Sequence, residues 1–269
     1  MNKNTKRFIS SIIIFLTLFL SVSSISSAKK EEYIDKANLY KGVITINFKA
    51  QNKNKTKVRI SKGENYYDYD LVSGDTFALQ LGNGKYTVMI LENIEGRSYK
   101  NVYKEELTLK LKDENDIYLQ SIQNINWDKD MKVIKTAKSL TKRVKTDEEK
   151  IKIIYNYIIK KIKYDNKKAV SVKSTYIPSI EAIAESKKGI CYDYASLYAS
   201  MLRSVGVPTK LVMGNNINLD VYHAWNEVYI AKTDEWITVD TTFDSANYKN
   251  KPSKNIEKNS KDYKVKCFY

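Results

Sequence analysis

Three residues of the kinds that perform nucleophilic acyl transfer occur in order along the chain. Cys191 stands in segment 189–195, G-I-C-Y-D-Y-A, where a glycine precedes an apolar helical pattern. His223, the only histidine, and Asp240 follow it. A thiol attacks a carbonyl carbon, an imidazole moves protons, and a carboxylate orients the imidazole. We therefore interpret Cys191 as the nucleophile, His223 as the general base and acid, and Asp240 as the orienting group.

The start of a helix at position 191 would favour an ionised thiol. Unpaired backbone N–H groups and the helix dipole stabilise a negative sulfur, and Gly189 is expected to form the tight turn that presents it. The same N–H groups stabilise the oxyanion of a tetrahedral intermediate. Tyr176 and Trp225 are candidates for a second oxyanion donor, and together with Tyr192 they are predicted to contact the substrate.

The strand register decides whether Asp240 reaches His223. Side chains alternate between the two faces of a strand, so the two residues share a face only with certain hairpin loops. A four-residue loop at 231–234 would pair Ile230 with Glu235 and place Asp240 diagonal to His223, within side-chain reach. A loop longer by one residue would put them on opposite faces. We predict the four-residue loop.

Each of these residues also has a structural interpretation. Cysteine is often a buried structural residue, and a lone histidine in a strand is often a packed bystander. Cys191 and Cys267 are the only cysteines, and in an oxidising compartment they could form a disulfide that blocks the nucleophile. One histidine without a C-x-x-C pair offers too few ligands for zinc, so we expect no metal and no other cofactor. The three residues taken together favour the catalytic interpretation.

Residues 1–28 are typical of a secretory signal peptide. Basic residues precede an apolar run at 8–22, and the small residues at 26–28 suit a cleavage site. An uncleaved anchor is the alternative, but the run is shorter than the ~20 residues that a spanning helix needs. We predict a secreted or cell-wall-associated protein without stable membrane insertion after cleavage.

The chain carries a formal net charge of +15. Such a charge favours polyanionic surroundings, among them anionic cell-wall polymers. The lysines are scattered rather than gathered in arginine-rich patches with stacking aromatics, so nucleic-acid binding is not expected. The expected partners are therefore a protein or peptide substrate, including cell-wall peptides, and anionic cell-wall polymers.

Residues 29–126 are predicted to form a β-rich accessory domain, a spacer or binding module. The segments with strand-like patterns are 43–48, 57–60, 76–81, 86–90, 107–111 and 117–119. The sequence G-N-G at 82–84 is a hairpin signal between two of them. Short strands separated by turn residues indicate a small β-sandwich.

Residues 127–269 are predicted to form the catalytic domain. A period near 3.6 predicts helices at 131–144, at 146–162 with a capping box, after Pro178, and from Cys191 to Gly206. Strands are predicted at 209–213, 223–230, 236–242 and 263–268, the last after a Lys/Asn-rich loop at 247–261. Helices followed by antiparallel strands indicate an α+β arrangement.

These motifs resemble the transglutaminase-like superfamily of papain-like cysteine enzymes. The matching stretches are 164–165 (YD), 189–195 (GICYDYA), 201–208 (MLRSVGVP), 223–228 (HAWNEV) and 236–242 (WITVDTT). The resemblance implies Cys191 as nucleophile, His223 as general base and acid, and Asp240 as the group that orients the imidazole. The expected fold class is α+β, with an N-terminal β-sandwich-like domain followed by a transglutaminase-like domain whose helices pack on an antiparallel sheet.

Such a resemblance leaves the reaction open. Relatives include crosslinking transamidases, peptidases, a de-N-glycosylating amidase and inactive members, and the active ones differ in what resolves the acyl intermediate. We expect a secreted acyl-transfer enzyme acting on peptide or glutamine amides of cell-surface or extracellular proteins, with hydrolysis ahead of crosslinking. The alternative is a catalytically silent cell-wall adhesion or scaffold protein that retains the fold.

Overall fold

The computed structural model describes residues 32–50, 54–246 and 255–269. The predicted signal peptide and part of the predicted Lys/Asn-rich loop lie outside these residues. Within them, Tyr33–Tyr269 forms one compact unit. No helix among the described residues combines the length and the apolar character needed to cross a membrane.

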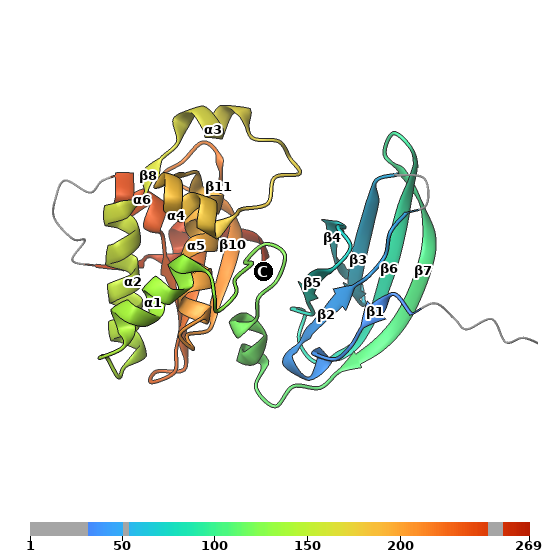
Figure 1. The fold of residues 1–269 in the computed structure, drawn as a ribbon, viewed down its shortest axis with the longest axis horizontal. Helices are drawn as coiled ribbons and strands as arrows, with labels where there is room; N and C mark the ends of the chain where they lie inside the picture. Colours follow the sequence, from blue (N-terminus) through green and yellow to red (C-terminus); the bar gives the residue numbers. More distant parts are fainter. Residues whose placement is uncertain (1–31, 51–53, 247–254) are drawn as a thin grey trace, which may run out of the picture. The chain divides into compact units, whose positions relative to one another are not determined.

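Two antiparallel sheets form the N-terminal part of the described chain (Figure 1). The first, in the order β1-β2-β5, contains β1 (Ile34–Asp35), β2 (Val43–Ile46) and β5 (Asp75–Ala78). The second, in the order β4-β3-β6-β7, contains β4 (Asn65–Asp70), β3 (Thr56–Lys62), β6 (Gly84–Glu95) and β7 (Ser98–Leu109). Alternate residues of β6 are buried, so one face of the second sheet contributes to an apolar core that both sheets share.

The prediction of a hairpin at 82–84 is wrong. β5 pairs with β2, whereas β6 pairs with β3 and β7, so the strands that flank this turn lie in different sheets. The Asn83 side chain instead bonds to Leu111, donating to its carbonyl oxygen at 3.0 Å and accepting from its N–H at 2.7 Å. The turn therefore carries the chain from one sheet to the other.

Two further elements of this part differ from the prediction. Segment 117–119 is not a strand but the end of a 3₁₀ helix, η2 (Glu114–Leu119), which Asp113 caps by accepting from the N–H of Asn115 at 2.8 Å. Strand β4 is absent from the prediction because its sequence, N-Y-Y-D-Y-D, lacks apolar alternation, and only Tyr69 in it is buried.

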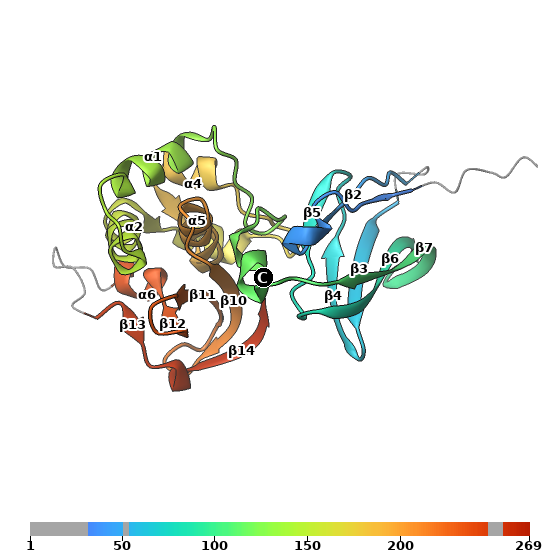
Figure 2. The same cartoon turned by 90° about the horizontal axis from the view of Figure 1, so that it is seen from below.

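Helices pack beside an antiparallel sheet in the C-terminal part (Figures 1 and 2), which confirms the α+β class. The helices are α1 (Lys132–Thr141), α2 (Asp147–Lys161), α3 (Asn166–Ser171), α4 (Ile180–Ser186), α5 (Cys191–Arg203) and α6 (Thr241–Ala246). The sheet follows the order β13-β12-β11-β10-β14, with β10 (Thr209–Asn216), β11 (Tyr222–Ile230), β12 (Glu235–Val239), β13 (Glu257–Lys258) and β14 (Tyr263–Phe268). A 3₁₀ turn, η3 (Ser260–Asp262), precedes β14.

The helix starts follow local signals in the sequence. The capping box before α2 is confirmed, because Thr146 Oγ1 accepts from the N–H of Glu149 at 3.3 Å and the Glu149 carboxylate accepts from the N–H of Thr146 at 3.5 Å. Helix α3 is absent from the prediction because N-K-K-A-V-S carries no apolar stripe. The strand predicted to continue through Thr241 and Thr242 ends at Val239, and these threonines begin α6 instead.

Helix α5 is the most buried helix of this part and lies against β10 and β11. Asn226 of β11 donates to the carbonyl oxygen of Ala195 in α5 at 3.0 Å. Two short strands, β8 (Lys163–Tyr164) and β9 (Lys188–Gly189), pair in parallel, and β9 directly precedes α5. The pairing of β9 with β8 therefore fixes the chain at the point where it enters α5.

Candidate active site

Cys191 is the first residue of α5, as the sequence predicts. Ile190 before it has an extended backbone, with φ −93° and ψ 176°, so the chain enters the helix at the thiol. The approach is fixed by β9, because the N–H of Asp165 donates to the carbonyl oxygen of Gly189 at 2.9 Å. The Cys191 side chain is partly buried. The unpaired backbone N–H groups at the start of α5 stabilise an anion at this position.

Gly189 is needed for a different reason from the predicted tight turn. It lies in β9, and a Cβ atom placed on it would stand 2.6 Å from the Cβ of Asp193. The backbone of Gly189 is not in the left-handed region. The absence of a side chain therefore makes room for Asp193 on the first turn of α5.

His223 and Asp240 are joined by a buried hydrogen bond. His223 Nε2 lies 2.7 Å from Asp240 Oδ2, and the two side chains are 4 % and 0 % exposed. The predicted register is confirmed, because Ile230 pairs with Glu235 across the loop at 231–234. Since Nε2 is bound to the carboxylate, Nδ1 is the imidazole nitrogen left for the thiol.

Asp240 has two further partners that hold its carboxylate in place. Oδ1 accepts from the backbone N–H of Phe243 at 2.9 Å, so Asp240 also caps α6. Oδ2 accepts a second hydrogen bond from the hydroxyl of Tyr263 on β14 at 3.1 Å. The carboxylate is thus fixed by three elements, namely β11, α6 and β14.

The electrostatic surroundings of His223 favour the imidazolium. Burial lowers the pKa of His223, but the hydrogen bond to Asp240 and the neighbouring Cys191 outweigh it and raise this pKa to about 9. Cys191 is thus one of the two side chains that raise the pKa of the imidazole. At neutral pH the site therefore holds a charged imidazole beside a thiol, which is the arrangement that stabilises a thiolate.

Trp225 is buried beside the imidazole. Its ring stacks on His223 with a centroid distance of 6.3 Å and packs against Tyr263 at 5.0 Å. It is 1 % exposed, and its Nε1 has no hydrogen-bond partner among the described residues. In this arrangement Trp225 supports the imidazole, and its contact with substrate stays a prediction.

Tyr192 and Tyr176 lie next to each other near the start of α5. Their rings meet edge to face with centroids 6.2 Å apart. The hydroxyl of Tyr192 accepts from Asn124 Nδ2 at 2.6 Å, and that of Tyr176 donates to Asp193 Oδ1 at 2.5 Å. Both hydroxyls are already bound within the protein, and their contact with substrate also stays a prediction.

Sequence reasoning missed two groups of residues at this site. Tyr263, the second partner of Asp240, had no signal in the sequence beyond its place at the start of a predicted strand. Asp193 and Lys168, which form an ion pair at 2.6 Å, could have been found in part. An acidic residue at the third position of a helix is a known capping signal, and G-I-C-Y-D provides one.

Cys191 and Cys267 are both free thiols, so the disulfide alternative does not apply to this structure. Cys267 lies on β14, where its Sγ is 3.7 Å from the hydroxyl of Tyr222. Among residues 32–50, 54–246 and 255–269, no group of three or more His, Cys, Asp or Glu side chains could hold a metal ion.

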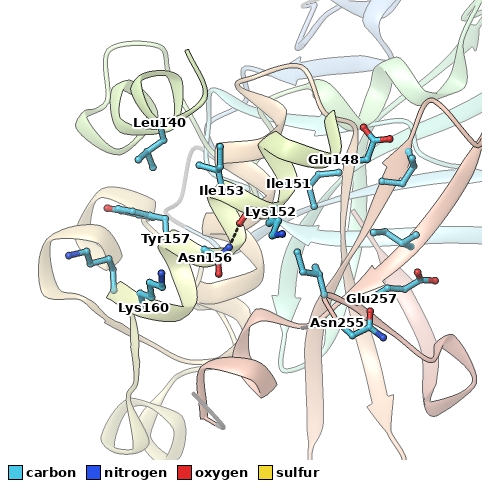
Figure 3. A pocket seen from close by; sticks show the side chains of 14 residues that line it. Leu140, Glu148, Ile151, Lys152, Ile153, Asn156, Tyr157, Lys160, Asn255 and Glu257 are labelled. Carbon is cyan, nitrogen blue, oxygen red and sulfur yellow. Dashed lines mark hydrogen bonds between the residues drawn. The ribbon is translucent and has the colours of Figure 1, made fainter. Parts of the chain in front are cut away.

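A separate cavity of about 1080 Å³ opens beside α2 (Figure 3). Its apolar lining comes from Leu140, Ile151, Ile153, Tyr157, Ile230, Ile237 and Ile256. None of the residues that line it is Cys191, His223 or Asp240. The candidate triad therefore lies outside this cavity.

Comparison with known proteins identifies the C-terminal part. Residues 134–241 match the family described as the transglutaminase-like superfamily, and this match includes all three candidate catalytic residues. This part of the chain is therefore similar to the transglutaminase-like superfamily. A search of curated proteins gives no match.

Similar solved structures include a transglutaminase, a provisionally assigned cysteine protease from Cytophaga hutchinsonii and LapG from Legionella pneumophila in an EGTA-treated form. The transglutaminase is 23% identical, with 49% of this chain and 35% of that chain covered and a TM-score of 0.35. The Cytophaga protein is 16% identical (70% and 72% covered, TM-score 0.42), and LapG is 18% identical (49% and 66% covered, TM-score 0.37). The match thus spans about a third of the transglutaminase chain.

Proposed function

We propose that this chain, which is similar to the transglutaminase-like superfamily at residues 134–241, is a cysteine-dependent acyl-transfer enzyme. Its substrates are peptide or glutamine amides of proteins and peptides outside the cell. The observation that carries the proposal is the buried 2.7 Å bond between His223 and Asp240, with Cys191 beside the imidazole at a helix start.

The reaction begins with attack on the amide. The Cys191 thiolate forms a bond to the carbonyl carbon, and backbone N–H groups at the start of α5 stabilise the resulting oxyanion. The His223 imidazolium gives its proton to the leaving nitrogen, and the C–N bond breaks to release an amine or ammonia. A thioester on Cys191 and a neutral imidazole remain.

The second half-reaction decides the product. Neutral His223 removes a proton from water or from an amine, which attacks the thioester and releases the Cys191 thiolate. Water gives a carboxylate, whereas a lysine amine gives an isopeptide crosslink. We place hydrolysis first because water outnumbers any amine unless the site excludes it.

The location of the reaction is part of the proposal. The signal-peptide pattern at 1–28 supports secretion, and the net charge of +12 that remains once Lys3, Lys6 and Arg7 are removed with it supports retention among anionic cell-wall polymers. Cell-wall peptides are therefore the first substrates to examine.

The test is mass spectrometry of products. A glutamine-donor peptide and isolated cell-wall peptides are incubated with the protein, with and without a labelled primary amine. Deamidation or cleavage identifies a hydrolase, and incorporation of the amine identifies a transamidase. Loss of every product in Cys191→Ala is expected. An unchanged product pattern in that variant contradicts the proposal and favours a non-catalytic adhesion or scaffold protein.

A further inference from the structure

A buried carboxylate stands two residues after the candidate nucleophile. The side chain of Asp193 is 0 % exposed on the first turn of α5. Its Oδ2 accepts from the backbone N–H of Ile190, the residue before Cys191, at 2.9 Å. Asp193 therefore fixes the backbone at the point where the thiol enters the helix.

Two side chains from a different segment complete the surroundings of this carboxylate. Lys168 of α3 places its Nζ 2.6 Å from Asp193 Oδ2, and the hydroxyl of Tyr176 donates to Oδ1 at 2.5 Å. Lys168 Nζ also donates to the Tyr176 hydroxyl at 2.6 Å. The three side chains form a closed set, which we call the Asp193 clamp.

The charge of Asp193 matters because the sulfur reacts as an anion. A carboxylate on the first turn occupies the same positive field of the helix start that would stabilise a thiolate. Two like charges on the same helix turn of a partly buried site also repel each other. An unpaired Asp193 would therefore oppose the ionised form of Cys191.

We propose that Lys168 is a positioning residue for the nucleophile. Its ammonium neutralises Asp193, so the carboxylate holds the turn before Cys191 without repelling the thiolate. Tyr176 keeps the ammonium and the carboxylate together, a role distinct from the predicted substrate contact. This inference rests on the proposed function of Cys191 as the nucleophile.

The test measures the rate of iodoacetamide alkylation of Cys191 at pH 7, with all proteins carrying Cys267→Ser. Lys168→Met keeps the aliphatic stem and removes the charge, and it should slow alkylation by about tenfold or more. Lys168→Arg should retain most of the parent rate. The matched control is Lys167→Met, an exposed neighbour on the same helix, which should stay within about twofold of the parent.

Two variants separate the charge effect from loss of structure. Lys168→Met with Asp193→Asn removes both charges and should restore alkylation toward the parent rate. Asp193→Asn alone leaves the ammonium unopposed and should alkylate at least as fast as the parent. If the Asp193 clamp has only a structural role, the double variant will be alkylated no faster than Lys168→Met, and Asp193→Asn will be alkylated more slowly than the parent. Either result overturns the inference.

The alkylation rate of the parent protein separates failure of the proposed function from failure of the role of Lys168. Parent alkylation no faster than that of glutathione contradicts the proposed function itself. Fast parent alkylation with an unaffected Lys168→Met contradicts only the role of Lys168.

Discussion

At the scale of single residues, the site depends on one imidazole with two neighbours of different kinds. The hydrogen bond to Asp240 fixes the ring and favours its charged form, and Cys191 also raises the pKa of the imidazole. Trp225 and Tyr263 support this pair by packing and by a second hydrogen bond to the carboxylate. Each of these contacts predicts a measurable change.

Replacing Asp240 with Asn removes the charge but keeps an oxygen that can cap α6. The pKa of His223 should fall from about 9 toward its ordinary value, because the main group that raises it is neutralised. We expect kcat/KM at pH 7 to drop by on the order of 10²-fold or more. The alkaline limb of the pH profile, near pH 9 in the parent, should move to lower pH. An unchanged profile would show that Asp240 does not act on the imidazole.

The same shift makes stability depend on pH. The pKa of His223 is raised above its unfolded value of 6.5, so its contribution is fully present below pH 6.5 and is lost as pH rises through about 9. The free energy of unfolding should therefore fall by up to about 3 kcal/mol between these values. Urea unfolding across this range measures it, and His223→Asn should lack this part of the slope. Equal slopes in both proteins would contradict the assigned shift.

At the scale of elements, the start of α5 is held by β9 and by Asp193, whose side chain packs against Gly189. Gly189→Ala would place a Cβ 2.6 Å from the Asp193 Cβ, which is too close, so β9 or the first turn of α5 has to shift. We expect a loss of about 1–3 kcal/mol in stability together with reduced activity. Lys188→Ala, an exposed neighbour in the same strand, is the control and should behave as the parent. A fully active and stable Gly189→Ala would show that the site tolerates a shifted turn.

Apolar stripes, helix caps and loop lengths determine which elements of the fold can be predicted from the sequence. Helices α2 and α5 carry apolar stripes, and α2 has a capping box, so local rules predict them. The hairpin register from Ile230 to Glu235 follows from loop length, and it brings Asp240 to His223 as expected. The short helix α3 buries no residue and strand β4 buries only Tyr69, so neither carries the apolar periodicity from which an element is predicted.

Non-local partners are the part of the site that the sequence conceals. Tyr263 reaches Asp240 because β14 joins the sheet beside β10, a pairing that no local motif encodes. Lys168 and Tyr176 contact Asp193 because α3 and the loop after it lie against the start of α5. The order Cys, His, Asp is therefore visible in the chain, whereas the residues that support it are not.

At the scale of the whole molecule, the residues before Trp127 contribute to the environment of α5. Asn124 donates to Tyr192, and its carbonyl oxygen accepts from Ser196 Oγ at 2.8 Å. Arg203 at the other end of α5 donates to the carbonyl oxygen of Gln120 at 2.6 Å. The apolar core of the N-terminal sheets also includes Ala195 and Ala199 of α5.

These contacts predict that the C-terminal part depends on the preceding residues. A protein limited to residues 127–269 would expose apolar surface of α5 and β10 and lose the hydrogen bonds from 120–124. It should unfold at a lower temperature than a protein of residues 29–269 and bind more of a hydrophobic dye. Identical thermal unfolding of the two would mean that 127–269 is an independent domain.

The central claim is that His223 holds Cys191 in a reactive state. Its most direct test is the alkylation rate of Cys191 by iodoacetamide at pH 7 in Cys267→Ser, compared with the same protein carrying His223→Asn. We expect a rate above that of glutathione in the first protein and a loss of about tenfold or more in the second. A rate no higher than that of glutathione, unchanged by His223→Asn, would contradict it.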